Sequence, residues 1–142
     1  MNAALAHFDR IDSIDSMRLL AAVNEAALRE GRRIPILVQF NCSGEDAKGG
    51  FEPGALGEVA ARVKDLEGVS LEGLMTIGPL AGGAGAARPA FRLLARLKRD
   101  LEDRLGRGLP ELSMGMSGDL EVAIEEGATV VRVGTALFGA RN

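Results

Sequence analysis

Short apolar runs alternate with longer amphipathic segments along the chain, and this alternation restricts the fold more than any other feature. Residues 34–41, IPILVQFN, form an apolar run of strand length, and residues 69–78, VSLEGLMTIG, form another. Val, Ile and Leu on both faces of such runs are typical of parallel strands that helices cover. The pattern therefore predicts an α/β fold of parallel βα repeats.

Five strands can be counted, with a helix after each of the first four. The strands are predicted at residues 8–14, 34–41, 69–78, 111–115 and 129–139. The helices are predicted at residues 15–31, 54–68, 88–106 and 119–127. The first helix should begin near Asp15 or Ser16 and stop at Gly31, and the second should end at Gly68, because glycine is common just after a helix.

The third helix has the clearest core-facing side. One helical face carries Phe91, Leu94, Leu97, Leu101 and Leu105. The glycine-rich residues 78–89, GPLAGGAGAARP, are predicted to be a mobile loop between strand and helix. No composition shift marks a domain boundary, so residues 1–142 are interpreted as a single domain.

The composition is that of a folded domain without a run of basic residues that could bind a polyanion. Of 142 residues, 46% are hydrophobic and 26% charged, and the formal net charge is -3. The 20 acidic and 17 basic residues are dispersed, so neither a nucleic acid nor a membrane is expected as a partner. The single cysteine, Cys42, and the lack of an apolar leader favour the cytoplasm. No cluster with metal-ligand spacing is present, so no metal ion is expected.

Polar and small residues follow the last two strands, where ligands bind in α/β sheets and barrels. Ser117 precedes a helix that begins near Asp119, and free N–H groups at such a point favour an anion. Gly134 allows close approach of a ligand, and Thr135 adds a hydroxyl. These residues predict a phosphate cradle. The alternative is that Ser117 is only a helix N-cap and Gly134 only a turn.

Arg132 favours the ligand interpretation. It lies inside an apolar strand, two residues before Gly134. A guanidinium in such a place must find an acceptor, since arginine is rarely buried unpaired. We therefore expect it to point into the site. Glu125 and Glu126, in contrast, are expected to face solvent.

Four segments together carry a family resemblance. They are IDSIDSMRLLAAVN at residues 11–24, FNCSGEDAKGGF at 40–51, LEGLMTI at 71–77 and LSMGMSGDLEVAIEEGATVVRVGTALFG at 112–139. The chain resembles the pyridoxal 5'-phosphate homeostasis protein family (YggS or PROSC-like) over essentially its whole length. The resemblance implies a TIM-type (β/α)8 barrel like that of alanine racemases, with pyridoxal phosphate held as an imine on a lysine at the end of the first strand.

The resemblance also implies roles for individual residues. The phosphate would be held by Ser117, Gly134 and Thr135, and Arg132 would face the pyridine nitrogen. The rest of the cofactor pocket would include Met116, Asn41 and Met75. A guanidinium donor leaves the ring nitrogen unprotonated and makes the ring a poor electron sink, which discourages carbanion chemistry. No catalytic residue is therefore assigned.

The chain also departs from the family pattern. Members begin with three further strands, including the one with the imine lysine, so the chain is expected to be the carboxyl-terminal part of a barrel. Lys64 and Lys98 are expected on solvated helix faces and Lys48 in a loop, and none matches the cofactor lysine. An incomplete barrel should keep open edges and an apolar inner face, from which we expect self-association.

Three functions remain open. The preferred one is a non-catalytic protein of intracellular pyridoxal phosphate homeostasis. The second is a truncated structural remnant that keeps the cradle without tight cofactor binding. The third and least favoured is an amino-acid racemase, which needs a second base. In alanine racemases that base is a tyrosine, and this chain contains no Tyr.

Overall fold

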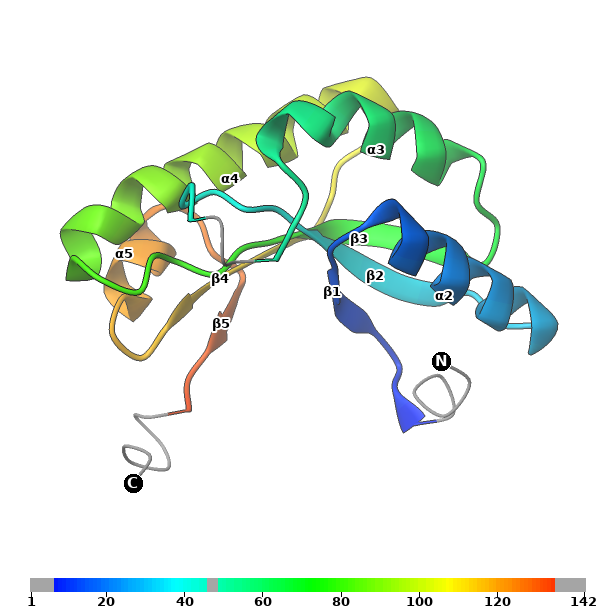
Figure 1. Cartoon of the computed structure of the whole chain (residues 1–142), viewed down its shortest axis with the longest axis horizontal. Coiled ribbons are helices and arrows are strands. Elements are labelled where there is room, and N and C mark those ends of the chain that lie inside the picture. Colours follow the sequence, from blue (N-terminus) through cyan, green and yellow to red (C-terminus); the bar gives the residue numbers. More distant parts are fainter. Residues whose placement is uncertain (1–6, 46–48, 135–142) are drawn as a thin grey trace.

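A computed structural model describes residues 7–45 and 49–134 and has a five-stranded parallel sheet at its centre (Figure 1). The strands are β1 (Ile11–Ile14), β2 (Ile34–Gln39), β3 (Val69–Met75), β4 (Glu111–Met116) and β5 (Val130–Arg132). Each strand pairs in parallel with the next one in sequence. The predicted α/β class with parallel strands is confirmed, and the sequential arrangement matches part of a TIM-type barrel.

The helices cover one face of the sheet, as Figure 1 shows. They are α2 (Met17–Arg29), the 3-10 turn η1 (Pro53–Ala55), α3 (Leu56–Lys64), α4 (Gly83–Leu105) and α5 (Leu120–Glu125). No described helix covers the other face, which we call the open face. Within the described residues, no helix combines the length and the apolar character that a membrane crossing requires.

The start and the stop of α2 agree with the sequence prediction. Ser16 is the N-cap, and its side chain accepts a 3.1 Å hydrogen bond from the main-chain N–H of Leu19. Gly31 follows the helix with a φ of 64°, a left-handed conformation that glycine adopts without strain. The helix buries Leu20 and Val23 against the sheet.

The predicted end of α3 at Gly68 is wrong. The helix ends at Lys64, and Gly68 instead lies against α2, where its N–H donates a 2.7 Å hydrogen bond to Asn24 Oδ1. A Cβ atom on Gly68 would come within 2.4 Å of the Asn24 main-chain oxygen. This glycine is therefore explained by a close contact between elements that a helix-capping pattern does not reveal.

The prediction of a loop over residues 78–89 is also wrong in its second half. Helix α4 begins at Gly83 and contains Pro89. Its alanine-rich first turns are good helix formers, and Ala87 and Ala90 are buried, so packing compensates for the glycines and the proline. The predicted apolar face of α4 is confirmed, because Phe91, Leu94 and Leu101 are fully buried in the core.

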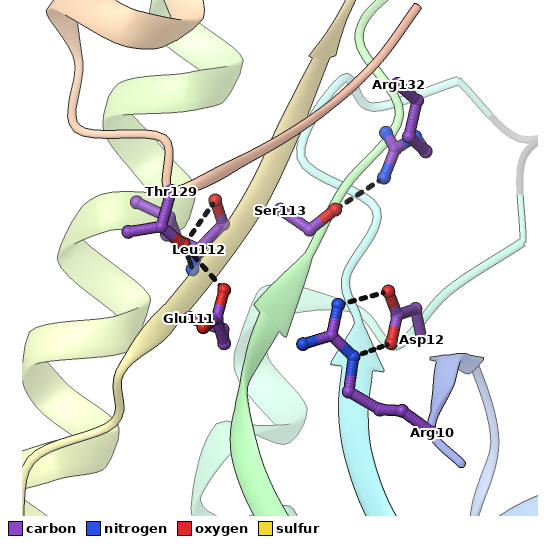
Figure 2. A network of polar contacts seen from close by, with 7 residues as sticks. All are labelled: Arg10, Asp12, Glu111, Leu112, Ser113, Thr129 and Arg132. Carbon is purple, nitrogen blue, oxygen red and sulfur yellow. Dashed lines mark hydrogen bonds and ion pairs between the residues drawn. The ribbon is translucent and has the colours of Figure 1, made fainter.

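The two faces of the sheet differ in character. Ile34, Ile36 and Val38 of β2 pack into the core under the helices. The open face carries hydrophilic side chains, among them Arg10, just before β1, and Asp12, Ser113 and Arg132 of the strands (Figure 2). Contrary to the expectation, the open face is therefore not uniformly apolar, because an ion pair and hydrogen bonds occupy part of it. Self-association through the sheet edges at β1 and β5 stays a prediction.

Candidate functional site

The carboxyl ends of the strands form a rim, and several residues predicted from the sequence lie on it. Asn41 follows β2, Met75 ends β3, Met116 ends β4, and Gly134 lies two residues beyond β5. Because the strands are parallel, these positions are at the same edge of the sheet. We call this rim the strand-end site. Thr135, the remaining predicted phosphate contact, lies outside the described residues.

Arg132 ends β5, and its guanidinium reaches back over β4 (Figure 2). Its Nη1 donates a 2.8 Å hydrogen bond to Ser113 Oγ, and its Nη2 donates a 2.7 Å hydrogen bond to the main-chain oxygen of Thr76. Both acceptor residues are buried. The sequence argument that this guanidinium must find acceptors is thus confirmed, and both acceptors are neutral.

The charge of Arg132 is not matched by a carboxylate within the described part of the chain. None of the ion pairs there includes it, and burial lowers the pKa of its guanidinium, against smaller opposite effects of Asp12 and Asp119. Asp12 is already held by Arg10 through hydrogen bonds of 2.6 and 2.9 Å (Figure 2). A half-buried cation without a matching anion is stabilised by any acceptor that a ligand brings.

A cavity of about 320 Å³ lies where β4 leads into α5. Its lining residues are Ala84, Ser117, Gly118, Asp119, Leu120, Glu121 and Val122. Asp119 is the N-cap residue of α5, and its Oδ1 accepts a 2.7 Å hydrogen bond from the Met116 N–H. The alternative that Ser117 is the N-cap is therefore wrong, and Ser117 is a wall residue of the cavity.

Asn41 uses its side chain to shape the loop after β2. Its Nδ2 donates to the main-chain oxygen of Glu45 at 2.8 Å, and its Oδ1 accepts from Ser43 Oγ at 3.3 Å and from Gly44 N at 3.2 Å. These bonds form a compact turn beside the strand-end site. Neighbouring Cys42 is half-buried, and burial raises the pKa of its thiol to about 11.

The other predicted residues differ in how much of them is accessible. Met75 is buried, whereas 46% of Met116 is exposed. Among the described residues, no atom is within 4 Å of the position that a Cβ on Gly134 would take, and the φ of Gly134 is not positive. Neither their packing nor the backbone conformation thus requires glycine there, and no described side chain blocks the approach of a ligand.

Sequence reasoning missed the partners of Arg132. Ser113 is a polar residue inside β4, which is otherwise apolar after Glu111, and it pairs in register with Met75, a predicted pocket residue. Such a serine between Leu112 and Met114 is a signal that could have been read from the alternation of β4. Thr76 contributes only its main-chain oxygen to Arg132, so its residue type gave no such signal.

The expectation that Glu125 and Glu126 face solvent is confirmed for Glu125, which is exposed, and is wrong for Glu126. Glu126 accepts hydrogen bonds from Arg88 at 2.6 Å and Arg92 at 3.1 Å, and only 15% of its side chain is exposed. Glu125, which is more exposed, also pairs with Arg88. Bonding to Arg88 lowers the pKa of Glu126. These pairs join α4 to the carboxyl end of α5.

The described lysines lie away from the strand-end site. Lys64 is exposed at the end of α3, and Lys98 of α4 lies 3.4 Å from Glu102 in an i, i+4 ion pair. Lys48 lies outside the described residues. In the part of the chain that the structure describes, no group of three or more His, Cys, Asp or Glu residues is arranged to hold a metal ion.

Comparisons with known proteins agree on one family and one fold. The family model described as "Alanine racemase, N-terminal domain" matches residues 2–142. The pyridoxal phosphate homeostasis protein of Aquifex aeolicus is 44% identical over 93% of this chain, which spans 58% of that protein. The structure of PipY from Synechococcus elongatus PCC7942 without PLP is 35% identical, with a TM-score of 0.90 over 97% of this chain and 65% of that one. The same protein with PLP bound gives 34% identity and a TM-score of 0.86, over 97% of this chain and 64% of that one.

Proposed function

Because the chain belongs to the family of the alanine racemase N-terminal domain, we propose that it is part of a cytoplasmic protein that binds pyridoxal 5'-phosphate and catalyses no reaction. The relatives are named for homeostasis of this cofactor, and the PipY structure was solved with it bound. The chain spans 58% of the Aquifex aeolicus relative, so the proposal concerns the part of the pocket that these residues supply.

The guanidinium of Arg132 carries this proposal. It lies at the strand-end site with two neutral acceptors and, among the described residues, no paired carboxylate. When bound, pyridoxal phosphate supplies an aldehyde and an electron-accepting ring. Arg132 would face the ring nitrogen as a donor and, because guanidinium keeps its proton, that nitrogen would stay unprotonated. A residue with this role holds the cofactor and does not promote carbanion chemistry, in keeping with a carrier.

The phosphate end of the cofactor is assigned to Ser117, Gly134 and Thr135. Ser117 offers a hydroxyl on the wall of the 320 Å³ cavity, and the open space at Gly134 supports close approach of a phosphate to the main chain. Asp119 and Glu121 also line this cavity, so selectivity for a phosphate would depend on the N–H and hydroxyl donors. We assign the cofactor ring to the neighbourhood of Asn41, Met75 and Met116.

Binding of pyridoxal phosphate and of inorganic phosphate to single variants tests these assignments. The probe is the 31P NMR signal of each ligand, whose width reports binding. Ser117→Ala should weaken both ligands, because it removes a phosphate contact. Arg132→Gln should weaken pyridoxal phosphate and leave inorganic phosphate unchanged, since its assigned contact is to the ring. Ser70→Ala and Arg29→Gln are matched controls, because Ser70 lies at the amino end of β3 and Arg29 in the last turn of α2, at the opposite edge of the sheet from the strand-end site.

The outcomes separate the competing functions. Equal loss of both ligands in Arg132→Gln would contradict the ring assignment. Absence of binding by the unaltered chain would favour the remnant without cofactor affinity. Exchange of the α-hydrogen of an amino acid for deuterium, in the presence of the cofactor, would contradict the non-catalytic function and favour racemase-like chemistry.

A further inference from the structure

Three arginines of α4 surround a second cavity on the outer side of the molecule, away from the open face. The cavity has a volume of about 300 Å³ and is lined by Arg92, Ala95, Arg96, Arg99 and Glu126. We call it the arginine groove. We propose that the arginine groove binds an acidic peptide segment of a partner protein.

The charges in the groove are unbalanced. Arg92 is bonded to Glu126, which Arg88 also neutralises. The side chains of Arg96 and Arg99 are exposed, and neither guanidinium takes part in an ion pair or a hydrogen bond among the described residues. The groove therefore presents two uncompensated guanidinium groups on a protein whose formal net charge is -3.

Neighbouring acids do not satisfy these arginines. Asp100 lies four residues after Arg96, and Asp103 four residues after Arg99, which is the spacing at which helix ion pairs form. Neither of these two pairs is formed on α4. Since guanidinium groups bind carboxylates through two parallel N–H donors, the two arginines are suited to carboxylates from another chain.

The spacing of the arginines fits a peptide. Arg96 and Arg99 are three residues apart on α4, and therefore about 4.5 Å apart along its axis. Alternate side chains of an extended strand are separated by roughly 6.6 Å on the same face. Because arginine and glutamate side chains are long, glutamates at alternate positions of an extended peptide could reach Arg96 and Arg99 together. Ala95 leaves room for the peptide backbone between the arginines, because its side chain is a single methyl group.

The surroundings of the groove disfavour a nucleic acid. A continuous polyanion would pass from Arg99 to the acidic residues Asp100 and Asp103, which would repel its next phosphates. Nor do the residues that line the groove include an aromatic side chain on which bases could stack. A short acidic segment meets the cations and can avoid the acids, and this favours a peptide.

Fluorescence anisotropy with a labelled hexaglutamate peptide at low ionic strength tests the proposal. The double variant Arg96→Gln/Arg99→Gln should lower the affinity about tenfold or more, because two charge-assisted contacts are lost. The control Arg18→Gln/Arg29→Gln changes the net charge equally, at exposed positions of α2, and should lower it much less. Circular dichroism should show both variants folded, since all four side chains are exposed.

Three results would overturn the proposal. The first is that hexaglutamate does not bind, and the second is that the two double variants lose equal affinity for it. The third is that a single-stranded oligothymidylate binds more tightly than hexaglutamate at Arg96 and Arg99. A labelled hexaglutamine peptide should not bind. Binding of pyridoxal phosphate by the Arg96→Gln/Arg99→Gln variant should be unchanged, which keeps this proposal separate from the cofactor site.

Discussion

Arg132 and Thr76 are 56 residues apart in the sequence and are joined by a 2.7 Å hydrogen bond from the guanidinium to a main-chain oxygen. The bond spans β4, where Ser113 supplies the second acceptor at 2.8 Å (Figure 2). One side chain thus connects the carboxyl ends of β3 and β5 to the middle of β4. The residue assigned to the cofactor ring is therefore also held by the sheet, which limits its movement before a ligand arrives.

Removing the Ser113 hydroxyl should weaken this connection. In Ser113→Ala the Nη1 donor of Arg132 loses its buried acceptor, and we expect the free energy of unfolding to fall by about 1 kcal/mol. Urea denaturation followed by circular dichroism measures the change, since the chain has no Trp. Ser13→Ala, at an exposed position, should be nearly neutral. Equal free energies of unfolding for the two variants would show that water accepts the hydrogen bond of Arg132 in place of the Ser113 hydroxyl, with no loss of stability.

Cys42 should react slowly with alkylating reagents in the folded protein. Burial raises the pKa of its thiol from 9.0 to about 11, so at pH 8 the thiolate fraction is about a hundredfold lower than for an unshifted thiol. Mass spectrometry after iodoacetamide treatment should show slow labelling in buffer and fast labelling in urea at the same pH. Equally fast labelling in both would contradict the shift.

The same shift gives a stability change with a definite sign. A thiol whose pKa is higher in the folded state stabilises the fold fully below the unfolded pKa and loses that contribution as the pH rises through the folded value. The free energy of unfolding should therefore decrease between about pH 9 and pH 11. In Cys42→Ala this part of the decrease should be absent.

Glu126 should show the opposite pH dependence. Its pKa is lowered, chiefly by bonding to Arg88, so its contribution is present above the unfolded pKa and is lost as the pH falls through the folded value. The difference in unfolding free energy between the unaltered protein and Glu126→Gln should therefore be largest near neutral pH and shrink in acid. Glu67→Gln is the control, because Glu67 is exposed and forms no ion pair with another described residue. A difference that stays constant with pH would contradict an electrostatic cause.

The sequence predicts most of the fold because apolar periodicity acts locally. The strand runs, the Ser16 cap and the apolar face of α4 are all readable from neighbouring residues. Contacts between distant segments are not readable in this way. Gly68 is explained only by its contact with Asn24, and the pairing of Glu126 with Arg88 only by the packing of α5 on α4.

The candidate site shows the same division. Arg132 could be selected from the sequence because a charged residue inside an apolar strand needs an acceptor. Its acceptors, Ser113 and Thr76, belong to neighbouring parallel strands, and only the sheet register brings them together. The alternation of β4 could place Ser113 on one face of the sheet, but its contact with Arg132 depends on how β4 and β5 pair.

The contact between β3 and β4 at Gly73 provides a last test of the register. A Cβ on Gly73 would lie 1.9 Å from the main-chain oxygen of its register partner Glu111, and a backbone atom cannot move away as a side chain can. Gly73→Ala should therefore force the two strands apart and lower the free energy of unfolding by about 3 kcal/mol or more, the range of severe core changes. Gly54→Ala is the matched control, because no atom lies within 4 Å of its added methyl group and its φ is not positive. Urea denaturation should show the control at or slightly above the stability of the unaltered chain. Should Gly73→Ala prove as stable as Gly54→Ala, the register of β3 against β4 would be incorrect, and with it the position of Ser113 under Arg132.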